Sequence, residues 1–166
     1  MTLDRWESPI TDRVRLRDVT EGDLPTLFLH QLDPEATAMA AFTSRDREAF
    51  DAHWRRILAD PTATKKTILV GEVVAGNIGA FTRAGDRLVG YWLGREHWGQ
   101  GLATRALQMF LDQEPARPLR AYVAKHNVGS IRVLEKAGFV VIGEADGSAQ
   151  GDGVEELVFE LGERSA

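Results

Sequence analysis

The spacing of apolar residues changes near residue 100, and this change constrains the fold more than any other feature of the chain. Before it come three segments rich in strand-forming residues, separated by the short polar breaks Gly71-Glu72 and Ala84-Gly85-Asp86. Breaks of that length join antiparallel neighbours. From 101 to 113 the apolar residues recur at helical spacing, and another strand-like segment follows at 118–123. Because a strand that returns after a helix can lie parallel to the first, one sheet with both kinds of pairing is predicted.

The rest of the chain extends this pattern in both directions. Thr20 stands three residues before Asp23, a capping-box spacing that opens a helix. Strands are predicted at 11–19, 66–70, 73–83, 88–93, 118–123, 139–144 and 155–161, and further helices at 44–60, 101–113 and 127–137. The predicted fold class is therefore α/β (α+β), with a mixed, mostly antiparallel central sheet of about seven strands flanked by helices. With 166 residues and no linker or repeat, we expect one domain over 1–166.

Composition excludes several classes of protein. The chain has no Cys, which rules out disulfides, thiolate metal sites and a cysteine nucleophile. A net charge of −5, with Lys and Arg scattered, argues against a nucleic-acid partner. No apolar run approaches the roughly 20 residues of a membrane helix, and the N-terminus lacks the apolar stretch of a signal peptide. No His, Asp or Glu pair has the spacing of metal ligands. A cytoplasmic protein with no metal is the expectation.

The sequence of 91–104 reads Tyr-Trp-Leu-Gly-Arg-Glu-His-Trp-Gly-Gln-Gly-Leu-Ala-Thr, in which a strand ends, a Gly-x-Gly turn follows and a helix begins. The first N–H groups of a helix lack internal partners, and the helix dipole adds partial positive charge there. Glycines let the backbone come close to a ligand, so this turn suits a pyrophosphate.

Three other interpretations of the turn stay open at this point. A nucleotide P-loop would need Lys-Ser/Thr after the second glycine, which is absent. A dinucleotide fingerprint would need a third glycine where Thr104 stands, and a suitably placed acidic residue about 20 positions later. The turn is also compatible with a plain strand-to-helix connection that binds nothing.

A second motif, at 127–139, reads Asn-Val-Gly-Ser-Ile-Arg-Val-Leu-Glu-Lys-Ala-Gly-Phe and is typical of a helix capped by Asn127 and ended by Gly138. With this motif the chain resembles the GCN5-related N-acetyltransferase superfamily, in its branch of ribosomal-protein and small-molecule acetyltransferases. The shared features, in order, are Gly-Tyr-Trp-Leu, Trp-Gly-x-Gly-x-Ala-Thr and Asn-x-x-Ser-x-x-Val-Leu-x-Lys-x-Gly-Phe.

The resemblance implies transfer of an acetyl group from acetyl-CoA to a primary amine of a protein N-terminus or small molecule, by direct attack in a ternary complex. The pantetheine arm would lie in a V-shaped gap between the fourth and fifth strands, and the glycine turn would hold the pyrophosphate. The implied coenzyme-binding residues are Tyr91, Trp92, Leu93, Trp98, Gly99, Gln100, Gly101, Leu102, Ala103, Thr104, Asn127 and Ser130. The alternatives are a noncatalytic acyl-CoA-binding or sensor domain and a nucleotide-dependent enzyme. A homodimer is the expected assembly, since dimers are commonest.

Two departures from the family pattern bear on catalysis. Glu96 stands where the family's turn usually begins with Gln or Arg, and Leu134 stands where many relatives have a tyrosine general acid. Ser130 or a water is therefore the expected acid. An alkylammonium, with a pKa of about 10.4, must lose a proton before attack, and Glu96 is the expected base. Ser130 as a plain helix-start residue and Glu96 as a solvated charge remain the alternatives. Trp54 and acidic residues near it are expected to line the acceptor pocket, with the loop 144–153.

Overall fold

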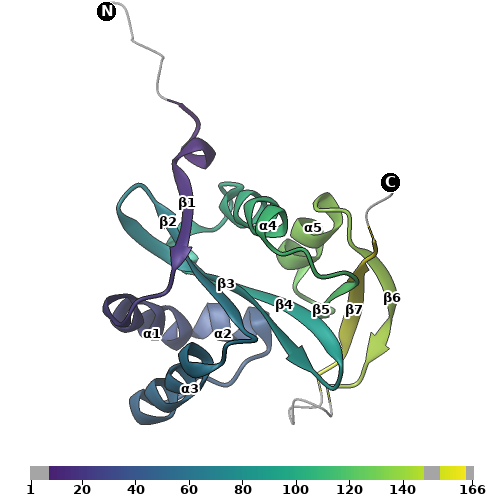
Figure 1. Ribbon diagram of the computed structural model, residues 1–166, viewed down its shortest axis with the longest axis horizontal. Helices are drawn as coiled ribbons and strands as arrows, with labels where there is room; N and C mark the ends of the chain where they lie inside the picture. The colour runs from purple at the N-terminus through teal and green to yellow at the C-terminus, as the bar shows by residue number, and fades with distance from the viewer. Residues whose placement is uncertain (1–7, 148–153, 164–166) are drawn as a thin grey trace, which may run out of the picture.

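The computed structural model describes residues 8–147 and 154–163 and places them around one seven-stranded sheet (Figure 1). The strand order is β1-β2-β3-β4-β5-β7-β6. The strands are β1 (Val14–Asp18), β2 (Thr64–Val70), β3 (Val73–Arg83), β4 (Asp86–Leu93), β5 (Leu119–Ala124), β6 (Val140–Ala145) and β7 (Glu156–Leu161). Only the β4–β5 pair is parallel among these residues, which confirms the predicted mixed, mostly antiparallel sheet.

Helices cover both faces of the sheet (Figure 1). On one side lie α1 (Leu24–Leu32), α2 (Pro34–Ala40) and α3 (Arg47–Ala59), and on the other α4 (Leu102–Gln113) and α5 (Val128–Lys136). Each side has its own buried cluster: Phe110 and Leu134 belong to the larger one, and Phe50 and Trp54 to the smaller. Apolar faces at helical spacing thus bury against the sheet, as their sequence pattern predicts.

The parallel pair of strands is unusually short. Only Arg87 with Leu119 and Leu88 with Arg120 are paired, and beyond them β4 and β5 diverge. Ion pairs surround the closed end: Arg87 to Glu114 at 3.3 Å, and Arg120 to Asp86 at 3.0 Å. The sheet is therefore a wedge that is closed at one end and open beside the N-termini of α4 and α5.

Asp23 connects β1, β2 and the start of α1. Its carboxylate is almost fully buried (3% exposed) and accepts two hydrogen bonds from Arg17, at 2.7 and 2.8 Å. It also accepts from the Thr20 amide at 2.9 Å and the Thr67 hydroxyl at 2.7 Å, and the predicted capping box is present. The hydrogen bond from Arg17, more than any other contact, holds the pKa of Asp23 far below its usual range.

The structure differs from the prediction mainly at α2, a seven-residue helix absent from the predicted elements. Asp33 caps it by accepting from the amides of Glu35 and Ala36, and Pro34 occupies its first turn. These are recognised start signals, but the helix buries only Ala36 and so has almost no apolar periodicity. The first strand is also shorter than predicted, because a 3-10 turn occupies Ile10–Arg13.

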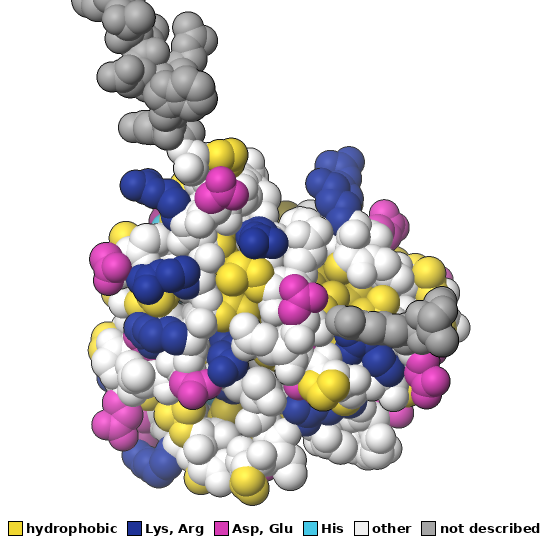
Figure 2. Space-filling model, turned by 45° about the horizontal axis from the view of Figure 1, so that its top comes forward, with side chains coloured by type: hydrophobic (Ala, Val, Ile, Leu, Met, Phe, Trp, Pro, Cys, Tyr) yellow, Lys and Arg dark blue, Asp and Glu magenta, His cyan; other side chains and the backbone are white. Residues whose placement is uncertain are grey.

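Charge is mixed on the face shown in Figure 2, where Lys and Arg side chains alternate with Asp and Glu. That face therefore has no basic stripe of the kind that nucleic-acid binders present. Within 8–147 and 154–163, no helix has the length and apolar character that crossing a membrane requires.

Candidate active site

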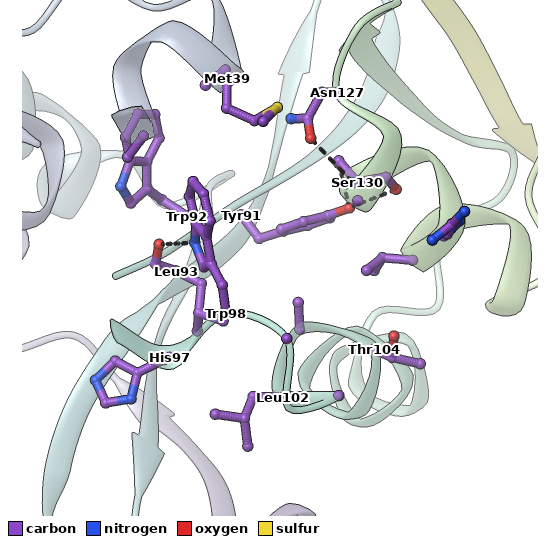
Figure 3. Close-up of a pocket in the computed structure, with 18 of the residues that line it drawn as sticks. Met39, Tyr91, Trp92, Leu93, His97, Trp98, Leu102, Thr104, Asn127 and Ser130 are labelled. Atoms are coloured by element: carbon purple, nitrogen blue, oxygen red, sulfur yellow. Dashed lines mark hydrogen bonds between the residues drawn. The ribbon is translucent and has the colours of Figure 1, made fainter. Parts of the chain in front are cut away.

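A cavity of about 530 Å³ lies at the open end of the wedge (Figure 3). Its walls come from α2, the end of β4, the turn at 97–101, the first residues of α4 and one face along the whole length of α5. All of the predicted coenzyme-binding residues except Gln100 line it: Tyr91, Trp92, Leu93, Trp98, Gly99, Gly101, Leu102, Ala103, Thr104, Asn127 and Ser130. The two sequence motifs thus meet in one cavity although they lie on different helices.

The N-terminus of α4 presents free backbone amides to this cavity. Gly99 and Gly101 have positive φ values of 75° and 78°, which only glycine adopts readily. No side chain caps the helix, and the first amide to bond back to its start is that of Arg105, to the Gly101 carbonyl at 3.1 Å. A Cβ on Gly99 would find no atom within 4 Å, so the turn borders open space. This arrangement fits a diphosphate.

The N-terminus of α5 carries a hydrogen-bonded pair of hydroxyls. Asn127 caps the helix by accepting from the Ser130 amide at 3.2 Å, and the Ser130 hydroxyl lies 2.7 Å from the Tyr91 hydroxyl (Figure 3). Burial raises the pKa of Tyr91 to about 12, although the contact with Ser130 works in the opposite direction. The family resemblance implied a coenzyme-binding role for Tyr91 and no role for its hydroxyl. Leu134, which stands where many relatives have a tyrosine, is fully buried in the core. The Tyr91 side chain nevertheless brings a phenol to the site from β4.

Trp98 closes one side of the cavity. Its indole Nε1 donates to the Leu93 carbonyl at 2.9 Å (Figure 3). This bond fixes the glycine turn against the end of β4, so the turn and the strand form one rigid wall.

Several residues of the cavity were not foreseen. Ala36, Met39 and Ala40 were missed because α2 itself was missed. Arg132 and Lys136 also line the cavity, from positions four apart on α5. Two cations at that spacing share one helix face, and this signal was present in the sequence.

Gln100 and Glu96 lie outside this cavity. The Gln100 side chain is exposed and donates to the Glu96 carbonyl at 3.3 Å. The Glu96 carboxylate is 66% exposed and lies 3.6 Å from His97 Nε2 and 3.8 Å from His30 Nε2. Of these neighbours His97 lines the cavity, but on the Leu102 side, away from the hydroxyl pair (Figure 3). Burial lowers the pKa of His30, which keeps this ring neutral at pH 7.

A second cavity, of about 550 Å³, lies on the α1–α3 face of the sheet and shares Tyr91 and Trp92 with the first. Trp54 lines it, as expected, and the Trp92 indole nitrogen is buried without a partner. Of the acidic residues near Trp54, Asp60 lines this cavity, and the other charged lining residues are the cations Arg45, Arg56 and Lys65. Acidic residues of α3 instead lie on its outer face; Asp51, for example, pairs with Arg47. Of the expected loop, 148–153 lies outside the described residues.

Among the described residues no cluster of three or more His, Asp or Glu could hold a metal ion.

The fold defined here, a mixed seven-stranded sheet with a splayed parallel pair, is that of the acyl-CoA N-acyltransferases. RimL, a ribosomal L7/L12 alpha-N-protein acetyltransferase solved in complex with coenzyme A, superimposes with a TM-score of 0.79 at 18% identity. The match covers 93% of this chain and 97% of that one, and at such identity it shows the fold alone.

The acetyltransferase (GNAT) domain family matches residues 13–140, and the chain belongs to it. The probable N-acetyltransferase YjcK of Bacillus subtilis (strain 168) is 32% identical over an alignment of 102 residues that covers 48% of this chain and 56% of that protein. The chain thus spans little more than half the length of this relative. The uncharacterized N-acetyltransferase p20 of Bacillus licheniformis is 29% identical over an alignment of 147 residues that covers 80% of this chain and 82% of that one. The resemblance inferred from the motifs is confirmed.

Proposed function

We propose that this protein is an N-acetyltransferase that moves an acetyl group from acetyl-CoA to a primary amine, by direct attack in a ternary complex. The observation that carries the proposal is the meeting of two cavities at Tyr91 and Trp92. One cavity has the uncapped helix N-terminus that a pyrophosphate needs, and the other approaches the same point from the opposite face of the sheet. A thioester and an amine can therefore reach one place by separate routes.

The first cavity matches the chemistry of coenzyme A in three respects. The amides at the start of α4 would hold the pyrophosphate, and the cations Arg132 and Lys136 would neutralise phosphate charge. The divergence of β4 and β5 leaves room for an extended pantetheine arm beside β4. Asn127 uses its side-chain oxygen to cap α5, which leaves its amide nitrogen to donate to a ligand.

The hydroxyl pair can carry a proton between the two substrates. An acetyl thioester supplies an electrophilic carbonyl and a thiolate leaving group, while the attacking nitrogen must shed a proton. The Tyr91 pKa of about 12 lies above that of a thiol, about 8.5, so the Tyr91 hydroxyl does not by itself transfer its proton to the thiolate. Instead, the two hydroxyls donate a hydrogen bond toward the departing sulfur. They also pass to it a proton that they receive from the nitrogen of the attacking amine.

Removing either hydroxyl is expected to lower kcat about tenfold, and removing both no more than the larger single loss, because the two act as one relay. The variants are Tyr91→Phe and Ser130→Ala, measured by thiol release under saturating acetyl-CoA. Tyr122→Phe is the control, since Tyr122 is the other tyrosine of the chain and lines neither cavity. Losses that multiply in the double variant, or an equal loss in the control, would contradict a shared relay.

The role of Glu96 as general base stays a prediction. Its carboxylate lines neither cavity, so it could act on a substrate only through another group. If it removes protons through His97, Glu96→Gln and His97→Gln should lower kcat/KM to a similar extent and flatten its pH profile. If kcat/KM is unchanged in both variants, neither side chain is the base, and the ammonium loses its proton to water.

The overall test has two stages. Acetyl-CoA should raise the melting temperature of the protein, and a panel of amines should then release free thiol from it. Binding without release on any amine would favour the noncatalytic sensor, whereas stabilisation by NAD or ATP alone would favour a nucleotide-dependent enzyme. The single domain, the cytoplasmic location and the homodimer expected from the sequence stay predictions.

A further inference from the structure

The second cavity has an excess of positive charge that nothing in the described structure neutralises. Arg45, Arg56 and Lys65 line it, and among residues 8–147 and 154–163 none of them has a carboxylate within 4.0 Å. The one acid in the lining, Asp60, is exposed and already accepts from the Thr62 amide at 2.8 Å and the Thr62 hydroxyl at 2.7 Å.

Lys65 and Arg45 are held in place by neighbouring side chains, whereas Arg56 is exposed. The half-buried Lys65 ammonium lies 5.4 Å from the centre of the Trp54 ring. The Arg45 guanidinium lies 5.1 Å from the centre of the Phe42 ring. The buried Gln31 fixes the Arg45 backbone, donating to its carbonyl at 3.0 Å and accepting from its amide at 2.7 Å. The site is therefore built before any ligand arrives.

The charges are close enough to affect one another. Burial, and then Arg45, lower the pKa of Lys65 to about 8. Burial, followed by Arg45, Lys65 and Arg56, lowers the pKa of the neighbouring His53 to about 4, so this ring is neutral at pH 7. A half-buried cation without a partner is unfavourable, and an anion placed among such cations gains charge-assisted hydrogen bonds.

We infer that the acceptor is an amine that also carries an anionic group, a carboxylate or a phosphate, which binds between Arg45 and Lys65 while the amine points to Tyr91 and Trp92. This inference rests on the proposed function and names the substrate class of the same site. A volume of about 550 Å³ suits a small molecule or the first residues of a peptide.

The same charges also favour the reactive form of the amine. Neighbouring cations lower the pKa of an ammonium, so they increase the fraction of neutral, nucleophilic amine. This effect needs no carboxylate base, which agrees with the place of Glu96 outside both cavities. A polycation such as spermidine would meet repulsion along the whole cavity.

Matched amines test the inference directly. The pairs are O-phosphoethanolamine against ethanolamine and 6-aminohexanoate against hexylamine, with spermidine as the polycation. The anionic member of each pair should have at least a tenfold higher kcat/KM. Two peptides that begin Ala-Asp-Asp and Ala-Lys-Lys distinguish a peptide N-terminus from a small molecule as the source of the anion. If ethanolamine, hexylamine or spermidine proves as good as the anionic compounds, the inference is wrong.

Lys65→Met locates the effect, with Lys66→Met as its control. Lys66 is the next residue of β2, lies outside both cavities and pairs with the exposed Asp18 at 2.6 Å. In Lys65→Met the preference for the anionic amine should fall at least tenfold, while Lys66→Met should keep the full preference. Equal preferences in the two variants would overturn the assignment.

The inference and the proposed function can fail separately. Calorimetry with O-phosphoethanolamine, without acetyl-CoA, should show binding that Lys65→Met weakens at least tenfold and Lys66→Met does not. If acetyl-CoA neither binds nor reacts, the proposed function fails. If acetyl-CoA binds and neutral amines react, but O-phosphoethanolamine does not bind, only the anionic acceptor fails.

Discussion

Gly101→Val is expected to weaken acetyl-CoA binding about 100-fold. Gly101 precedes α4 with a φ of 78°, and a β-branched residue is a strained outlier there, at about 1–3 kcal/mol. To relieve the strain, the start of α4 must turn, and its amides then no longer converge on the pyrophosphate. Each lost hydrogen bond to a charged group costs about 1.5–3 kcal/mol, so the combined effect reaches two orders of magnitude. Calorimetry with acetyl-CoA measures it.

Gly85→Val is the matched control for this prediction. Gly85 lies in the β3–β4 turn with a similar φ of 85°, and a Cβ at this position would meet no atom within 4 Å. It lines neither cavity, so its substitution introduces the same backbone strain away from the site. Acetyl-CoA affinity should be unchanged in Gly85→Val. If both variants lose affinity for acetyl-CoA equally, general destabilisation of the fold explains the effect, and the backbone amides at the start of α4 do not.

Asp23→Ala is expected to lower the free energy of unfolding by about 1–3 kcal/mol at pH 7, the cost of leaving buried hydrogen-bond donors unsatisfied, because Arg17 is 41% exposed and water can solvate its charge. The substitution leaves Arg17, the Thr20 amide and the Thr67 hydroxyl without their shared acceptor. Urea unfolding measures the change. In the control, Asp18→Ala, an exposed pair with Lys66 is lost, and the change should stay below about 1 kcal/mol.

The effect of Asp23→Ala should also depend on pH. The pKa of Asp23 in the folded protein lies below its unfolded value of about 3.9, so its contribution is fully present above that value. As pH falls below about 3.9 the unfolded chain takes up a proton first, and this contribution is progressively lost. The difference in stability between wild type and Asp23→Ala should therefore narrow in acid. A difference that stays constant between pH 7 and pH 3 would show that Asp23 acts through packing rather than charge.

Local motifs in the sequence predicted β4, α4 and α5, three of the elements that line the first cavity. A glycine turn before a helix, and an Asn cap before another, are each read from a few adjacent residues, and the structure brings both motifs to one cavity. The short helix α2 was missed because its start signals are not followed by an apolar stripe. The hydroxyl of Tyr91 could not be assigned either, since its partner Ser130 lies 39 residues away on another element.

The basic lining of the second cavity shows a different limit of sequence interpretation. Arg45 precedes α3, Arg56 belongs to it, and Lys65 lies on β2. No motif joins them, because their proximity depends on how the helix packs across the sheet. The resemblance suggested that acidic residues near Trp54 line the acceptor pocket, but one of them, Asp51, pairs with Arg47 and does not line the cavity.

The short pairing of β4 with β5 has a consequence for the width of the first cavity. Two residue pairs and the ion pairs of Arg87 and Arg120 hold the two strands together at the closed end of the wedge. Arg87 and Glu114 line neither cavity. Substitutions at these two positions are therefore expected to change how far β4 and β5 diverge beside Tyr91, although no residue that lines a cavity is altered.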